Sequence, residues 1–204
     1  MANSRSAKPG SRTAPGRTVH QIKITVRDSR PPIWRRLEVP SGITLRELHD
    51  VIQAAFGWED YHLWAFQSER DRYGTADRDL GIRSAASRQL RQVAARTGDR
   101  LRSTYDFGDD GRHDILIEDI TEPEPDTAYP RCLTGRRACP PEDCGGIWGY
   151  DYLIEILSDP HHEEHEDRLE GLGLDSADQS DPAAFDPAEV NAALSAHATV
   201  LDEN

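Results

Sequence analysis

The chain has 204 residues, of which 36% are hydrophobic and 30% charged, and its formal net charge is -13. This length suits one domain with small appendages, and no apolar run approaches the ~20 residues that a membrane-spanning helix needs. The N-terminus also lacks the apolar core of a signal peptide, so we expect a cytoplasmic protein that does not bind a membrane.

Charge is distributed unevenly along the chain. Residues 1–36 hold nine Lys/Arg against one acid, whereas residues 142–204 hold one base against 17 acids. Such runs are typical of solvated surfaces, and a basic arm is also able to contact nucleic acid weakly. Because the acidic remainder would repel phosphate, the sequence favours a protein or peptide partner over nucleic acid.

The N-terminal segment differs in composition from the rest. Residues 1–18 are rich in Ser, Arg, Pro and Gly and have almost nothing to bury, which predicts a disordered basic tail. Residues 19–204 are expected to form a single domain. Its first strand is predicted to begin at Val19, where Ile and Val alternate with polar residues, and a Pro pair leads into a second strand over 33–39.

A helix is predicted over 44–56. Thr44 and Glu47 form a capping box, apolar residues follow at helical spacing, and Gly57 ends the helix in the left-handed conformation. A third strand is predicted over 62–67. This strand–strand–helix–strand opening indicates an α+β fold with a β-grasp-like mixed sheet.

The second half is built around a predicted hairpin over 101–120, in which two alternating segments flank the acidic turn Gly108-Asp109-Asp110-Gly111. The sequence predicts a polar loop over 70–81 and a short helix over 84–96 before it, and irregular structure over 121–147 after it. The C-terminal part is predicted to be helical and acidic, with helices over 148–157, over 161–172 and from Pro187.

Three cysteines lie in a Pro- and Gly-rich loop over 129–149. A loop with so little apolar content needs something to order it, and three thiolates with one imidazole complete a tetrahedral zinc site. The hypothesis is a structural zinc site of Cys132, Cys139, Cys144 and His113. The alternative is three reduced, partly buried thiols.

Four carboxylates surround the central turn, namely Asp106, Asp109, Asp110 and Asp114. With Glu59 or Asp60 they form a candidate Mg²⁺ site of the kind that nucleases use. The alternative is turn chemistry, because Asp and Gly are preferred in turns and Asp side chains accept hydrogen bonds from backbone donors.

Aromatic and histidine side chains supply two further candidates. Trp34, Trp58 and Trp148 are candidates for a groove that recognises a peptide or nucleotide, and the alternative is packing between sheet and helices. His49 and His62 are candidate ligands or acid–base groups, and the alternative is hydrogen-bonded histidines at the edge of the core.

Five features occur in one order along the chain: RDSRPPIWRRLEVP, TLRELHDVIQAAFGWEDYHLWAF, YDFGDDGRHDI, YPRCLTGRRACPPEDCGGIWGY and the late Asp-Pro helix. With them the chain resembles the plasmid pRiA4b ORF-3-like family over about residues 19–195. Members are often labelled as transposon passenger or TnpR-like proteins. The resemblance implies an α+β domain of unknown function that is found near mobile elements.

No P-loop, dinucleotide-binding glycine pattern, GxSxG or HExxH motif occurs in the sequence. The leading hypothesis is therefore a mobile-element-associated binding or adaptor domain, without an evident catalytic set. One alternative is a metal-dependent enzyme that acts on nucleic acid through the Asp-rich turn. Another is a zinc-stabilised structural module.

Overall fold

The computed structural model describes residues 18–201, so the predicted tail lies outside the described residues apart from Thr18. The strands are β1 (Val19–Val26), β2 (Trp34–Pro40), β3 (Trp64–Gln67), β4 (Arg72–Gly74), β5 (Ile82–Ser84), β6 (Arg100–Tyr105), β7 (Gly111–Thr121), β8 (Ala128–Tyr129), β9 (Arg131–Arg136) and β10 (Thr199–Val200). The helices are α1 (Leu45–Phe56), α2 (Leu90–Val93), α3 (Gly146–Ser158), α4 (His165–Gly171) and α5 (Pro187–Leu194), and single 3₁₀ turns lie at η1 (Ala85–Ser87), η2 (Ala177–Gln179) and η3 (Ser195–His197).

Most strands join one 8-stranded sheet in the order β5-β4-β3-β6-β7-β1-β2-β9, and β8 and β10 form a separate pair. The sheet is mixed, because β4 and β5 run parallel while the other neighbouring pairs are antiparallel. The predicted α+β fold and the central β6–β7 hairpin are confirmed. The β-grasp detail is not confirmed, since β3 pairs with β4 and β6 and lies apart from β1 and β2.

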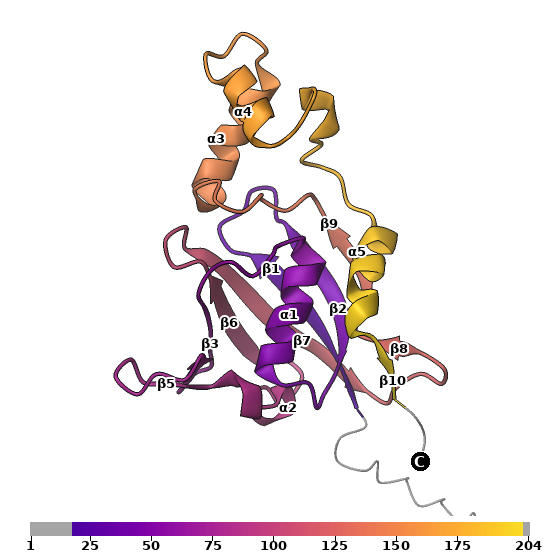
Figure 1. Ribbon diagram of the computed structural model, residues 1–204. Coiled ribbons are helices and arrows are strands. Elements are labelled where there is room, and N and C mark those ends of the chain that lie inside the picture. The colour runs from indigo at the N-terminus through magenta and orange to yellow at the C-terminus, as the bar shows by residue number, and fades with distance from the viewer. Residues whose placement is uncertain (1–17, 202–204) are drawn as a thin grey trace, which may run out of the picture.

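Helix α1 begins and ends as its sequence predicts. The Thr44 side chain accepts a hydrogen bond from the Glu47 backbone N–H, the Glu47 carboxylate accepts one from Thr44, and Gly57 takes the left-handed conformation at φ +77°. The apolar stripe of α1 lies on one face of the sheet beside α5 (Figure 1). The core therefore sits between this pair of helices and the buried side chains of the central strands.

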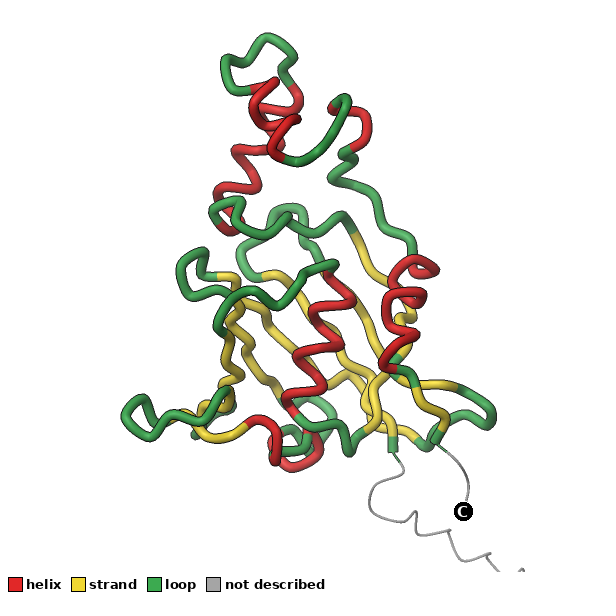
Figure 2. The backbone as a smooth tube through the Cα atoms, viewed as in Figure 1, coloured by secondary structure: helices red, strands yellow, loops and turns green. Residues whose placement is uncertain are grey.

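Helices α3 and α4 extend beyond the end of the sheet at which the β6–β7 hairpin turns (Figure 1). The tube drawing shows that loops fill the region between this end of the sheet and α3 (Figure 2). None of the helices in the described part of the chain combines the length and the apolar character that crossing a bilayer requires.

Four local predictions were wrong. The segment over 121–147 is not wholly irregular, because β9 pairs with β2 at one edge of the sheet. The segment over 70–81 is not a loop throughout, because it contains β4, which pairs with β3 and β5. The helix over 84–96 shrinks to α2 after the turn η1, and the acidic helix α4 starts four residues later than predicted, at His165.

The edge strand β9 is covered by a side chain of α5. The Asn191 amide accepts a hydrogen bond from the Cys132 backbone N–H at 2.7 Å and donates one to the Cys132 carbonyl at 3.0 Å. A neighbouring strand would make the same pair of bonds. Asn191 thus satisfies backbone groups that an exposed edge would leave open to another chain.

Candidate functional site

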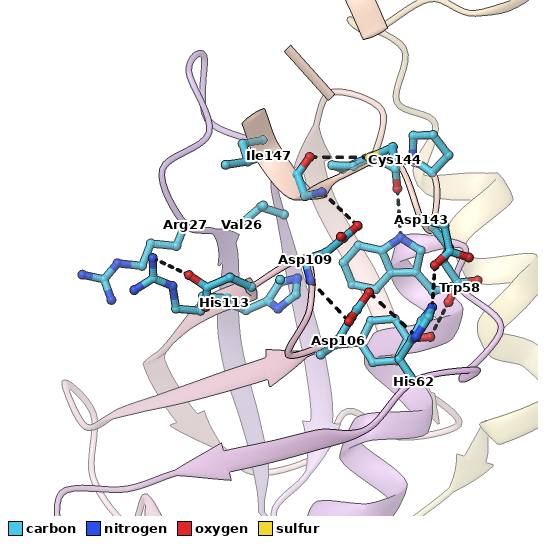
Figure 3. A pocket seen from close by; sticks show the side chains of 18 of the residues that line it. Val26, Arg27, Trp58, His62, Asp106, Asp109, His113, Asp143, Cys144 and Ile147 are labelled. Carbon is cyan, nitrogen blue, oxygen red and sulfur yellow. Dashed lines mark hydrogen bonds and ion pairs between the residues drawn. The ribbon is translucent and has the colours of Figure 1, made fainter. Parts of the chain in front are cut away.

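A pocket of about 80 Å³ opens at the end of the sheet next to α3 (Figure 3). Four segments that are distant in sequence line it: the end of β1, the loop after α1, the β6–β7 turn and the loop before α3. Its volume is well below the ~300 Å³ at which pockets for drug-sized ligands begin, so it suits a group the size of one side chain.

The β6–β7 turn is shaped by its own aspartates. Asp106 and Asp110 take left-handed backbone conformations at φ +56° and +52°, which Asp tolerates better than most residues. The Asp106 carboxylate accepts hydrogen bonds from the N–H groups of Gly108 at 2.8 Å and Asp109 at 3.3 Å. The turn chemistry that the sequence offered as an alternative is therefore present.

Asp109 connects the turn to the loop before α3. Its Oδ2 accepts hydrogen bonds from the backbone N–H groups of Gly145 and Gly146, both at 2.9 Å. These donors lie at the N-terminus of α3, where a negative charge is favoured by the helix dipole. This contact holds the loop over 140–148 across the pocket (Figure 3).

Stacked aromatic rings form one wall of the pocket. Trp58 stacks on Phe56 at 5.2 Å and on Tyr105 at 5.5 Å between ring centroids. The indole Nε1–H of Trp58 donates to the carbonyl of Pro140 at 2.9 Å. This hydrogen bond fixes the ring and fastens the loop before α3 to the end of α1.

His113 lies in the same wall, with its ring edge-on to Trp58 at 5.1 Å and to Phe56 at 5.3 Å. The side chain is only 1% exposed, and neither ring nitrogen makes a hydrogen bond of regular geometry within the described residues. Burial lowers the pKa of His113 to about 4, and the nearby His49 acts in the same direction, whereas the backbone of Gly111 and of Ser103 acts weakly in the opposite direction. A neutral ring with two unpartnered nitrogens is able to accept one hydrogen bond and donate another.

A histidine and two carboxylates converge at the mouth of the pocket. His62 Nε2 lies 3.1 Å from Asp143 Oδ1, and His62 Nδ1 lies 3.8 Å from Asp106 Oδ2. One ligand atom from each residue lies within 4.8 Å of the other two, a spacing that would allow one cation to contact all three. The Tyr105 hydroxyl donates to the Glu142 carboxylate nearby, and burial together with this carboxylate raises the pKa of Tyr105.

The pocket carries a surplus of negative charge. Two guanidinium groups line it, those of Arg27 and Arg112. Six carboxylates also line it, those of Asp28, Asp106, Asp109, Asp110, Glu142 and Asp143. The site therefore favours a ligand with positive charge over one with phosphate or carboxylate groups.

The predicted acidic cluster is only partly gathered. Asp106, Asp109 and Asp110 line the pocket, but Asp114 does not and instead lies 3.9 Å from the Arg102 guanidinium. Asp60, which was considered as a further ligand, hydrogen-bonds His49 at 2.7 Å away from the turn. The pKa of His49 is lowered because burial outweighs the attraction of Asp60.

Two of the three tryptophans that were predicted to form a groove line the pocket. Trp58 belongs to the stacked wall, and Trp148 at the start of α3 is 75% exposed. Trp34 does not line this pocket, because it lies on β2, where it contacts the cationic ends of Lys23 and Arg36.

The cysteines are spread around the loop. Cys144 lines the pocket as His113 does, Cys139 accepts a hydrogen bond from the Arg35 guanidinium at 2.9 Å, and Cys132 is buried in β9. Burial raises the pKa of Cys139 to about 12 and that of Cys144 to about 11. In the described chain, neither of the two groups of converging ligand atoms includes a cysteine. A zinc site of these three cysteines and His113 stays a prediction.

The convergence of Asp143 and Glu142 on the pocket was missed by sequence reasoning. Asp143 takes a left-handed conformation at φ +57° within a Pro- and Gly-rich loop, and no periodic pattern marks it. The phrase PPEDCGG, which places two acids between a Pro pair and a Gly pair, was the signal that could have drawn attention to them.

Comparison with known proteins finds a matching family model, a relative and a solved structure. The family model described as Plasmid pRiA4b ORF-3-like protein matches residues 18–193. The uncharacterized protein y4hQ of Sinorhizobium fredii is 38% identical over 180 residues, which cover 87% of this chain and 91% of that protein. The crystal structure of MM3350, a protein of unknown function from Methanosarcina mazei Go1, is 36% identical and superposes with a TM-score of 0.77, covering 84% of this chain and 97% of the other.

Proposed function

The chain belongs to the Plasmid pRiA4b ORF-3-like protein family, and we propose that it is a binding domain whose pocket receives a side-chain-sized group from a protein or peptide partner. The observation that carries this proposal is His113, which lines the pocket with two buried, unpartnered ring nitrogens. Buried polar groups in native proteins nearly always have a partner. A ligand in the pocket would supply one.

An apolar rim beside the pocket supports a macromolecular partner. We define the apolar rim as Tyr61, Leu63, Phe107 and Trp148, whose side chains are 72%, 74%, 47% and 75% exposed. The backbone of Tyr61 and Leu63 is hydrogen-bonded to Tyr105 and Asp106, which line the pocket. Exposed large apolar side chains that gather around a polar pocket are typical of interaction surfaces.

The protonated thiol of Cys144 favours binding over catalysis. Cys144 lines the pocket, and burial raises the pKa of its thiol to about 11. The reactive form of cysteine is the thiolate, so this side chain is a poor nucleophile at neutral pH. The same proposal includes an association with mobile elements, because the family's description names a plasmid. It also includes a cytoplasmic location, because the three cysteines are not paired in disulfides.

Peptide selection tests this function without knowledge of the partner. Random peptides displayed on phage are selected on the full-length protein and then measured against Trp148→Ala and Phe107→Ala. Selected peptides are expected to bind both rim variants more weakly, whereas Leu80→Ala, which removes a 63% exposed leucine away from the pocket, should bind as the parent does. Peptides that ignore both rim substitutions would place recognition elsewhere on the molecule.

A metal-dependent enzyme that acts on nucleic acid is the second candidate, and the convergence of His62, Asp106 and Asp143 favours it. Carboxylate oxygens and one imidazole suit Mn²⁺ or a similar divalent ion. Titration with Mn²⁺ should then broaden the NMR signals of the pocket residues, and labelled DNA or RNA should be cleaved only with the ion present. Cleavage that Asp143→Asn leaves intact would exclude this site.

A further inference from the structure

The charges around the pocket are not balanced evenly. Arg112 lies 2.9 Å from Asp110 and 3.6 Å from Asp28, and Arg27 lies 4.0 Å from Asp28. Both guanidinium groups of the lining are thus engaged on one side of the pocket. On the other side, Asp106, Glu142 and Asp143 have no Lys or Arg within ion-pair distance among residues 18–201.

His62 lies between two carboxylates on this side. Its Nδ1 is 3.8 Å from Asp106 Oδ2 and its Nε2 is 3.1 Å from Asp143 Oδ1. Nε2 is near Asp143 without the angle of a hydrogen bond, so this buried atom is unsatisfied. A cation with several N–H donors would pair with both carboxylates from a position between them.

The aromatic wall adds a second preference. The stacked pair Trp58 and Tyr105 borders the same space, and the faces of aromatic rings attract cations. Guanidinium groups are planar, stack on such rings and are more weakly hydrated than ammonium groups. This chain already packs one in that way, since the buried Arg35 guanidinium lies over the rings of Phe56 and Phe185.

The buried ring of His113 also suits a guanidinium group. His113 is 1% exposed and neutral at pH 7, so it is an acceptor for an N–H donor that enters the pocket. Arginine has five such donors in a fixed plane, enough to reach the carboxylates at the mouth and one acceptor inside. A cavity of about 80 Å³ holds a head group of this size but not a nucleotide.

We propose that the pocket binds the guanidinium group of an arginine side chain presented by a protein partner. Asp106 and Asp143 form ion pairs with it at the mouth, the aromatic wall borders it, and His113 accepts a hydrogen bond from it. The apolar rim contacts the residues of the partner on either side of the arginine. This inference rests on the proposed function, because it names the group that the proposed binding domain receives.

The experiment uses the full-length protein labelled with ¹⁵N and three capped amino acids as probes. N-acetyl-arginine methylamide is compared with the citrulline analogue, which has nearly the same shape without the charge, and with the lysine analogue. The indole N–H of Trp58, assigned with Trp58→Phe, reports on the pocket because it bonds to Pro140 at the wall. The arginine probe should shift this signal with saturation, and the citrulline probe should bind at least about tenfold more weakly, since a charged hydrogen bond contributes ~1.5–3 kcal/mol.

Matched variants test the residues. Asp106→Asn and Asp143→Asn remove one charge each and should weaken the arginine probe about tenfold. Both positions have φ between +56° and +57°, a conformation that Asn tolerates, and an amide oxygen at 106 still accepts from Gly108, so both variants are expected to fold. Asp114→Asn lies outside the pocket and should leave binding unchanged.

The outcomes separate the two proposals. If the citrulline probe binds as well as the arginine probe and shifts Trp58, the pocket remains a binding site and the preference for a cation is wrong. If the lysine probe binds as tightly as the arginine probe, the guanidinium assignment is wrong. If no probe shifts Trp58 and peptides selected on the protein also ignore the rim variants, both the inference and the proposed function fail.

Discussion

Replacing His113 with leucine is expected to make the folded protein less sensitive to acid. Burial lowers the pKa of His113 from 6.5 to about 4, so in the folded state its ring stays neutral until the pH is near 4. The unfolded chain takes up this proton near 6.5. Between these two values the unfolded state binds more protons, and the free energy of unfolding falls as the pH is lowered.

The size of the effect follows from the two pKa values. At 1.36 kcal/mol for each pH unit between them, the contribution of His113 that is present above pH 6.5 and lost by pH 4 is about 3 kcal/mol. Leucine cannot titrate, so His113→Leu lacks this loss. Above pH 6.5 the substitution should be nearly neutral or stabilising, because it also removes two buried nitrogens without partners.

Urea unfolding measured above pH 6.5 and near pH 4 checks this prediction. The difference in free energy of unfolding between the variant and the parent should grow by about 3 kcal/mol over this range in favour of the variant. The pKa of His20 is also lowered by burial, and this residue remains in each protein, so its contribution cancels in the difference. His161→Gln, at an exposed position, is the control. Parallel loss of stability in parent and variant would show that His113 is protonated or solvated in the folded state.

Three further predictions concern the framework around the pocket. Leu48→Ala should lower the free energy of unfolding by ~2–5 kcal/mol, because Leu48 is fully buried on the α1 stripe, and a loss below ~1 kcal/mol in urea would contradict its place in the core. Asn191→Ala should lower it by ~1–3 kcal/mol, because both backbone groups of Cys132 lose their partner, whereas Glu189→Ala on the same helix should change it little. The zinc hypothesis predicts about one zinc per purified chain by elemental analysis and its loss in Cys139→Ser, and metal-free protein would refute it.

The parts of the fold that the sequence predicts correctly are those fixed by neighbouring residues. The limits of α1 follow from Thr44, Glu47 and Gly57, which all lie within one turn of its ends. The β6–β7 hairpin follows from alternation on each side of a turn in which Asp106 accepts hydrogen bonds from the backbone N–H groups of Gly108 and Asp109. In both cases the decisive contacts span only a few residues, and local patterns record them.

The wrong predictions fall where distant segments supply the hydrogen bonds. The segment over 84–96 has helical spacing, but the N–H groups of Leu90 and Arg91 donate to the carbonyls of Ile43 and Ser41, so α2 begins only at Leu90. The β9 strand is stabilised by β2 on one side and by Asn191 on the other. None of these partners lies near its segment in the sequence.

In the candidate site, too, local features are visible in the sequence, whereas contacts between distant segments are not. The acids of the turn are prominent in the sequence, but their tasks differ according to contacts that the sequence does not reveal. Asp106 faces His62, Asp110 pairs with Arg112, and Asp114 lies outside the pocket. The convergence of Asp143 on His62 depends on the path of the whole loop before α3, so only the folded chain brings these two side chains together.

Asp109 holds the loop before α3 in place. Helix α3 begins at Gly146, and its N-cap residue Gly145 has no side chain to cap it. The Asp109 carboxylate from the hairpin accepts hydrogen bonds from the N–H groups of Gly145 and Gly146 instead. Gly146 has φ +66°, and a Cβ there would lie 2.2 Å from the Asp109 carbonyl oxygen, so the approach of the two segments requires glycine. Turn chemistry and a binding site are therefore compatible explanations for the acidic turn. Asp109 stabilises the start of α3, and because it does so the neighbouring Asp143 is placed where the proposed ligand would meet it.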